Sequence, residues 1–209
     1  MEPHPPRPPL CSPRVGPCAC ALAVASVALS SCVGLDERRH SAGDSGLGAT
    51  EPAFGVEVQR YPAGWIVGPR AELPIGADEV LVARLSWNAA DRGDFGRHDD
   101  EQGGGLGGGA GWRRYQSQDR SGWLWGLRAD FWWLDIDWED DPPTADQGDT
   151  GVLVFQPAVE AGYRLRFGQS RWCLDLTASV GLEINLVTDG ENVGQGPIGL
   201  LGATLCWGL

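Results

Sequence analysis

The 209-residue sequence contains no lysine, because all 16 of its basic residues are arginines. A chain without lysine can form neither a lysine Schiff base nor a P-loop phosphate site. Only three histidines are present, at positions 4, 40 and 98, which argues against a multi-histidine catalytic metal site. Acidic residues number 28, and the formal net charge is −12. This charge argues against nucleic acid as a partner, because phosphate binding needs a basic surface.

The chain also lacks an apolar run long enough for a membrane-spanning helix of about 20 residues. Residues 18–29 are apolar, follow a segment with two arginines, and precede small residues. This pattern predicts a secretory signal over residues 1–31. The run ends in Leu-Ser-Ser-Cys, which resembles a bacterial lipobox and implies acylation of Cys32. Ordinary cleavage near Ala28 is the alternative, and residues 32–53 are predicted to be a flexible tether.

Side chains from residue 54 onward alternate between apolar and polar, which is typical of β-strands. The clearest case is 171–188, where apolar residues hold every second position from Trp172 to Leu186. Such a strand is long for a soluble sandwich, but it suits a tilted membrane strand, which needs about 9–11 residues in hydrocarbon. We expect the following side chains to point outward: Leu174, Leu176, Leu182, Ile184 and Leu205.

Eight such segments can be counted in the chain, and the connections between them alternate between short turns and longer polar loops. This arrangement predicts an all-β fold, a closed eight-stranded antiparallel up-and-down β-barrel over residues 54–209. The predicted strands are 54–61, 64–75, 79–91, 105–117, 121–139, 151–167, 171–188 and 196–209. In the strand 121–139 we expect a bulge near Trp132 that would turn Asp135 and Asp137 inward.

Two segments carry a resemblance to a known family: DFGRHDDEQGGGLGG at 94–108 and EINLVTDGENVGQGPIGLLGATL at 183–205. The chain resembles the small eight-stranded bacterial outer-membrane barrels of the OmpA/OmpX-like kind, and more narrowly an uncharacterised outer-membrane barrel family. The resemblance implies an outer-membrane location with membrane lipid as the partner, and it brings no established activity or protein partner. Such barrels often end in an aromatic residue, whereas this chain ends at Leu209.

The inward face of the predicted barrel carries six arginines and six acids. Eight strands leave a lumen just wide enough for side chains to fill. Isolated buried charges are costly, so these groups should pair and plug the lumen. A proton or ion path is the alternative. The predicted lumen charges are Glu57, Arg70, Glu72, Arg84, Arg113, Arg128, Asp130, Glu160, Arg164, Arg166, Asp175 and Glu183.

Cys173 and Cys206 are the two cysteines that remain after the signal segment and Cys32. They lie nearly opposite each other on adjacent predicted strands, both facing inward, in a chain exported to an oxidising compartment. We therefore predict a structural disulfide, with two packed free thiols as the alternative. No cysteine spacing matches a zinc site, and we expect no metal and no cofactor.

The loop 92–104 is the strongest acidic cluster, and weak candidate calcium ligands there are Asp94, Asp99, Asp100 and Glu101. It lacks the spacing of an EF-hand loop, so a solvated acidic loop is the preferred interpretation. The leading functional hypothesis is a barrel with a structural or interaction role and no enzymatic activity. Two other classes stay open: a lipid-anchored, lipocalin-like binding barrel with its apolar faces inward, and a lipid-modifying enzyme that would use His98 as its base.

Overall fold

The computed structural model describes residues 51–93, 97–143 and 146–208. The predicted signal segment, Cys32 and Asp94 lie outside these ranges, so the lipidation of Cys32 stays a prediction. Within the described ranges, no helix has the length and hydropathy needed to cross a membrane.

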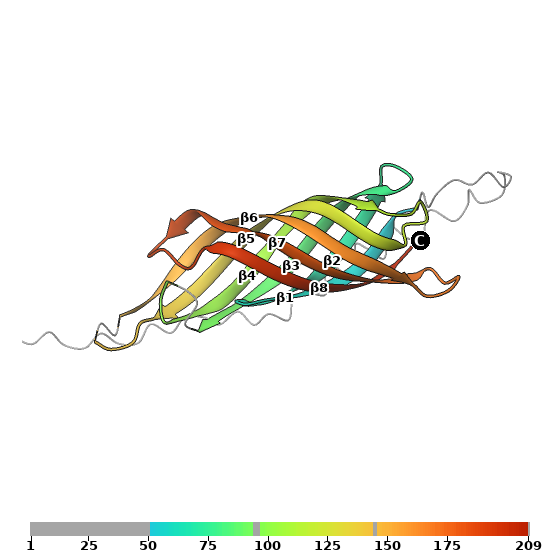
Figure 1. Cartoon of the computed structure of the whole chain (residues 1–209). Coiled ribbons are helices and arrows are strands. Elements are labelled where there is room, and N and C mark those ends of the chain that lie inside the picture. Colours follow the sequence, from blue (N-terminus) through green and yellow to red (C-terminus); the bar gives the residue numbers. More distant parts are fainter. Residues whose placement is uncertain (1–50, 94–96, 144–145, 209) are drawn as a thin grey trace, which may run out of the picture. The chain divides into compact units, whose positions relative to one another are not determined.

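Eight strands form one closed sheet in which each strand pairs with its neighbours in the chain and β8 pairs with β1 (Figure 1). Every pairing is antiparallel. The predicted closed eight-stranded antiparallel up-and-down barrel is therefore confirmed. The strands are β1 Ala53–Tyr61, β2 Gly64–Pro74, β3 Glu79–Gly93, β4 Asp100–Tyr115, β5 Gly122–Glu139, β6 Gln147–Arg166, β7 Trp172–Asp189 and β8 Gly196–Trp207.

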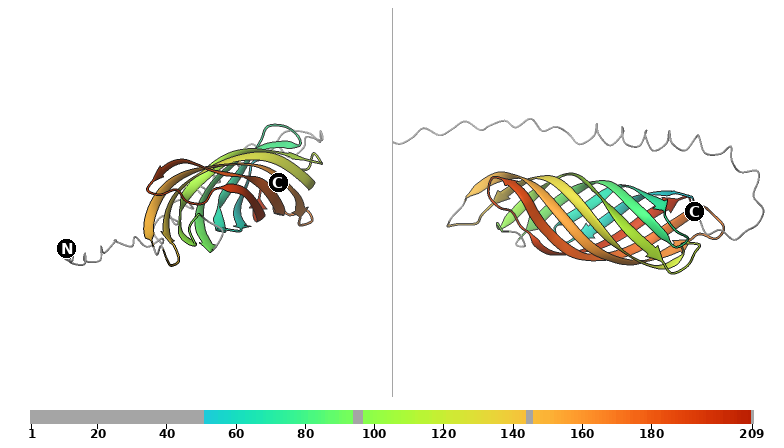
Figure 2. Two further views of the ribbon diagram at one scale, coloured as in Figure 1. Left: turned by 60° about the vertical axis from the view of Figure 1, so that its left-hand side comes forward. Right: turned by 90° about the horizontal axis from the view of Figure 1, so that it is seen from above.

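The two ends of the barrel differ in their connections. The connections β2–β3, β4–β5 and β6–β7 are turns at one end, which also holds the start of β1 and is called here the short-turn end. The connections β1–β2, β3–β4, β5–β6 and β7–β8 lie at the other end, called the long-loop end. The strands that form the wall are clearly tilted relative to the long axis of the barrel (Figure 2). A tilt of this kind is required to close a sheet into a barrel.

The alternation in the sequence places apolar side chains outside and polar ones inside. Leu176, Leu182 and Leu205, all expected to point outward, are each about half exposed. The preceding residues on the same strands, Asp175 before Leu176 and Thr204 before Leu205, are fully buried. This assignment is the reverse of a soluble protein, in which the exposed face of a sheet is the polar one.

The prediction of a bulge in β5 is wrong. β5 pairs with β4 and with β6 in an unbroken register, so Asp135 and Asp137 stay on the outer face and are exposed. The inward positions are taken by Trp132, Leu134 and Ile136. The physical reason is that β5 continues beyond its apolar outer positions, so polar residues face outward there without any change of phase. Among the described strand pairs, a register shift occurs between β6 and β7, at Leu153 and Val154.

Candidate functional site

Ten charged side chains meet in the half of the lumen nearer the short-turn end, and we call them the lumen network. Five are arginines and five are carboxylates, so the network is neutral in sum. Every member is less than 8% exposed. Its members are Arg70, Arg84, Arg113, Arg128, Arg164, Glu57, Glu72, Asp130, Glu160 and Asp175.

Arg113 on β4 is the most connected member of the lumen network. Its Nε donates to Glu160 Oε1 at 2.5 Å, and its Nη1 lies 3.3 Å from Glu72 and 3.1 Å from Asp175. A further ion pair of 3.7 Å reaches Glu57. These four carboxylates come from β1, β2, β6 and β7, so one guanidinium ties together strands on both sides of the barrel.

The network also contains a like-charge pair that the fold itself creates. Arg70 on β2 and Arg84 on β3 are directly opposite each other in the strand register. Like charges at opposed positions destabilise a sheet. Glu57 lies between them and accepts hydrogen bonds from both, at 3.3 Å from Arg70 and 2.9 Å from Arg84. This carboxylate therefore compensates the repulsion that the register imposes.

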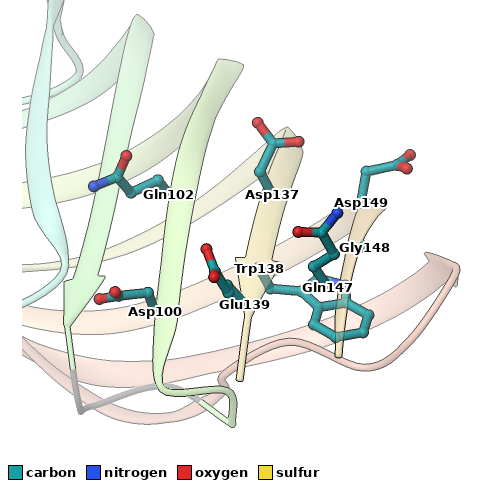
Figure 3. Close-up of a pocket in the computed structure, with 8 residues that line it drawn as sticks. All are labelled: Asp100, Gln102, Asp137, Trp138, Glu139, Gln147, Gly148 and Asp149. Atoms are coloured by element: carbon teal, nitrogen blue, oxygen red, sulfur yellow. The ribbon is translucent and has the colours of Figure 1, made fainter. Parts of the chain in front are cut away.

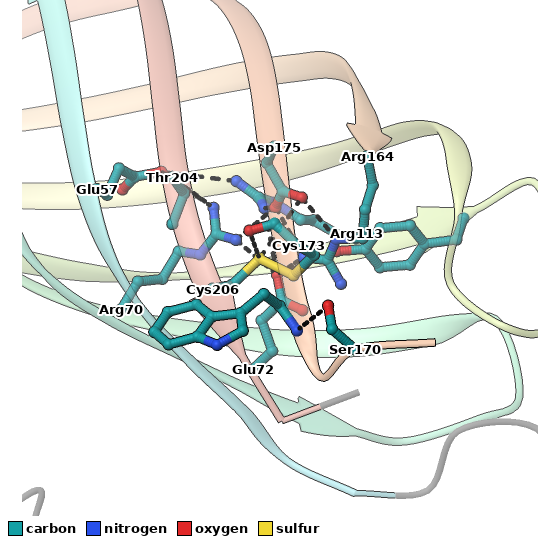
Figure 4. The surroundings of a disulfide bond; sticks show 12 residues. Glu57, Arg70, Glu72, Arg113, Arg164, Ser170, Cys173, Asp175, Thr204 and Cys206 are labelled. Atoms are coloured by element: carbon teal, nitrogen blue, oxygen red, sulfur yellow. Dashed lines mark hydrogen bonds and ion pairs between the residues drawn. A yellow bond between two sulfur atoms is a disulfide. The ribbon is translucent and has the colours of Figure 1, made fainter. Parts of the chain in front are cut away.

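A disulfide joins Cys173 on β7 to Cys206 on β8, with an S–S distance of 2.00 Å (Figure 4). The two residues are partners in the register, with Cα atoms 5.0 Å apart. Both are buried. Figure 4 shows the disulfide beside Asp175 and the arginines that surround it. The bond therefore links β7 and β8 next to the lumen network.

The half of the lumen nearer the long-loop end has a different character, because buried apolar side chains form a layer there. Trp132 is 2% exposed, and the glycines of β4 make space for its indole, since a Cβ on Gly107 would lie only 2.3 Å from the ring. The apolar layer consists of Tyr61, Ala63, Ile66, Ala90, Trp132, Leu134, Ile136, Val152, Val154, Val193, Ile198 and Leu200.

A second, smaller set of charges closes the long-loop end. Arg92 pairs with Glu101 at 3.2 Å and makes a closer ion pair with Glu183. Glu101 also accepts hydrogen bonds from the backbone N–H groups of Arg97, His98 and Gly194. This mouth cluster of Arg92, Glu101 and Glu183 thus ties two of the long loops to the inner wall.

Two of the twelve predicted lumen charges lie outside the lumen network. Glu183 faces inward but belongs to the mouth cluster, because β7 carries it past the apolar layer. Arg166 lies at the short-turn end, where its side chain is 26% exposed and 3.6 Å from Asp119. Hydrogen bonds from the hydroxyls of Ser117 and Ser121 hold the pKa of Asp119 below its ordinary value.

The weak calcium candidates do not converge. Glu101 is buried and taken up by the mouth cluster, whereas Asp100 is exposed on the outer face. Asp99 accepts a hydrogen bond from the backbone of Asp141. Cys173, Cys206 and Asp175 are the three potential metal ligands grouped within the described ranges, and the two sulfurs are already bonded to each other.

Sequence reasoning missed Arg92 as a lumen residue and took Glu101 for a loop ligand. Both could have been found from the alternation alone. Arg92 has the same parity as Arg84 on β3, and Glu101 has the same parity as Arg113 on β4. The strands simply continue farther than their apolar outer positions indicate.

His98 lies at the long-loop end. Its Nδ1 is 3.0 Å from Asp140 Oδ1, and its ring stacks on Trp138 with centroids 3.9 Å apart. Its Nε2 is buried without a hydrogen-bond partner, and no serine, threonine or cysteine side chain of the described ranges is bonded to the ring. The geometry supplies an oriented imidazole but no nucleophile beside it.

The outer face of the strands near the long-loop end is acidic. Asp137 on β5 is directly opposite Gln102 on one side and Asp149 on the other, and Asp100 is opposite Glu139. These side chains line an open groove of about 590 Å³ on the outer wall (Figure 3). They mark where the apolar outer surface of β4, β5 and β6 ends.

No family model and no curated protein matches the chain. Among solved structures, the N-terminal β-barrel domain of Pseudomonas aeruginosa OprF is similar at 15% identity and a TM-score of 0.44, covering 77% of this chain and 99% of that one. Neisserial surface protein A is similar at 12% identity and a TM-score of 0.40, covering 75% of this chain and 94% of that one. Identities this low carry no information on activity.

Proposed function

We propose that this protein is an integral barrel of the bacterial outer membrane with a closed lumen and a structural or interaction role. The observation that supports the proposal is the outer surface, because every one of the eight strands exposes large apolar side chains there, with β4 contributing Leu106. Soluble monomers rarely expose contiguous apolar patches larger than a few hundred square ångströms. Outer-membrane barrels carry an outward-facing apolar band of this kind, which the hydrocarbon of the bilayer covers.

Exposed tryptophans lie in two groups, one toward each end of this apolar surface. Trp65, Trp87 and Trp133 lie toward the long-loop end. A second group lies toward the short-turn end, consisting of Trp123, Trp125, Trp172 and Trp207. Aromatic girdles at both interfaces are typical of outer-membrane barrels. The acidic outer face of β4, β5 and β6 then extends beyond the bilayer into water.

The interior supports a closed barrel. Both the lumen network and the apolar layer consist of buried side chains, and a smaller apolar cluster is buried at the short-turn end, consisting of Val80, Val82, Tyr115 and Leu124. A soluble binding barrel would have the opposite arrangement, with a polar exposed face. An enzyme would need a nucleophile beside His98. Both alternatives are therefore less well supported than a closed membrane barrel without enzymatic activity.

A matched pair of substitutions on β6 tests the membrane assignment. Val159 is 57% exposed, and its neighbours across the strands are Leu127 and Val180. An arginine at mid-bilayer costs about 2–4 kcal/mol. We expect Val159→Arg to lower the free energy of unfolding from lipid vesicles by that amount.

Asp149→Arg serves as the control, because Asp149 is exposed on the outer face of the same strand beyond the apolar positions. Its effect should be small. The free energies are measured by urea titration of the vesicle-embedded protein, followed by tryptophan fluorescence. Equal tolerance of both substitutions would contradict insertion in a bilayer.

A further inference from the structure

The wall of the barrel has a notch at the long-loop end, above the β1–β2 hairpin. β1 pairs with β8 only as far as Leu201, although β8 continues to Gly196 along β7. On the other side of the hairpin, β2 pairs with β3 only as far as Ala90, and β3 continues to Gly93. The hairpin is thus shorter than the strands that flank it.

A cavity of about 230 Å³ lies at this notch. Tyr61 and Ala63 of the hairpin line it, together with Arg92 from β3, and Glu183 from β7. Pro197 and Ile198 of β8 add an apolar side. The cavity is smaller than the roughly 300–1,000 Å³ of pockets for drug-sized ligands, so it fits a small or slender molecule.

Glu183 supplies an incompletely satisfied charge in this cavity. Its side chain is 8% exposed, and Oε1 pairs with Arg92 Nη2. Its second oxygen, Oε2, makes no hydrogen bond to any residue in the described ranges. Arg92 is also shared, because its Nη1 donates to Glu101 and to the carbonyl of Gly194. One guanidinium therefore faces two carboxylates, and the mouth cluster carries a net charge of −1.

Arg60, at the end of β1 beside the cavity, does not compensate this charge. Arg60 is on the outer face, where its guanidinium lies 5.1 Å from the centre of the Trp65 ring. Because Arg92 is shared between Glu183 and Glu101, one negative charge of the mouth cluster is left uncompensated, and such a charge is unfavourable in a buried site. The cavity therefore favours a ligand that brings a positive charge.

We propose that the notch binds a small organic ammonium ion with a slender apolar stem. The ammonium would donate to Glu183 Oε2, and the stem would lie against Pro197, Ile198 and the ring of Tyr61. A tyrosine face also attracts a cation. A divalent metal fits less well, because calcium takes 6–8 oxygen ligands and the cavity offers one free carboxylate oxygen.

The test uses n-butylammonium, titrated by calorimetry into the full chain folded in zwitterionic detergent micelles. We expect saturable one-to-one binding, with n-butanol and Ca²⁺ each at least tenfold weaker. Equal affinity for n-butanol, preference for Ca²⁺, or no saturable binding would overturn the proposal. Because the assay uses micelles, its outcome is independent of whether the barrel inserts in a bilayer.

Three variants locate the site. Glu183→Gln should weaken n-butylammonium binding at least tenfold, and Pro62→Trp, at the exposed lip of the cavity, should abolish it without touching the ion pairs. Glu139→Gln, on the outer face, should leave it unchanged. If Glu183→Gln does not fold, Pro62→Trp decides the matter, and unchanged binding in that variant would overturn the assignment.

Discussion

The two halves of the lumen are lined by the same strands, yet they are filled by opposite chemistry. β5 places Arg128 and Asp130 in the lumen network and, on the same inward face, Trp132 and Leu134 in the apolar layer. The charged half is stabilised by directional ion pairs, each of which depends on its partner. The apolar half depends on packing, supplemented by single hydrogen bonds such as the one from the Tyr61 hydroxyl to Asn88. Closure of the barrel therefore does not rely on one kind of interaction.

The largest expected effect breaks the charged half. Arg113→Ala removes the guanidinium that contacts four buried carboxylates, and breaking a buried pair costs about 3–5 kcal/mol because it leaves uncompensated charge. Arg114→Ala is the matched control on the next residue, where the side chain is 50% exposed and the surface pair with Asp78 contributes about 0–1 kcal/mol. Urea unfolding from vesicles measures both. Equal losses for the two variants would contradict a network held by buried charge.

The apolar half should respond nearly as strongly, but by a different mechanism. Leu134 is 2% exposed within the apolar layer. Leu134→Ala removes buried methyl groups and leaves a cavity, which costs about 2–5 kcal/mol. Because no charge changes, the loss should be the same at low and high salt in the same unfolding assay. A loss that shrinks with salt would show that the apolar layer is not an independent unit.

A smaller effect tests how the two halves meet. Gly107 gives space to Trp132, so Gly107→Ala overpacks the junction and costs about 1–3 kcal/mol. A Cβ on Gly199 of β8 would meet no atom within 4 Å. Gly199→Ala should therefore change the unfolding free energy by no more than about 0.5 kcal/mol. Reversal of this order would contradict the close approach of β5 to Gly107, at the Trp132 ring and at the backbone oxygen of Phe131.

The sequence predicts the fold and most of the lumen network because alternation with a period of two survives wherever one face of a strand is apolar. All eight strands, and ten of the twelve predicted lumen charges, follow from it. The alternation no longer identifies strand residues where the strands extend beyond the apolar outer surface. β4 begins at Asp100 and not at residue 105, and β6 begins at Gln147 and not at residue 151.

Two features of the structure were not predicted. The sequence predicted a bulge that would turn Asp135 and Asp137 inward. Judged by polarity alone, acids that point outward beside an inward leucine give the same pattern as a bulge. Glu183 of the mouth cluster was predicted to face inward, but Arg92 and Glu101 were not, since they belong to strand extensions whose outer face is polar or glycine. A polar residue can therefore be assigned to the inner face from the sequence only in the part of a strand whose outward residues are apolar.

Single-channel recording in planar bilayers tests most directly whether the lumen is closed along both halves. The purified full chain, inserted into a bilayer, should give no steady current, because side chains can fill the interior of an eight-stranded barrel and we propose that the buried lumen network and apolar layer do so. Large, steady single-channel currents from the unmodified protein would contradict the account.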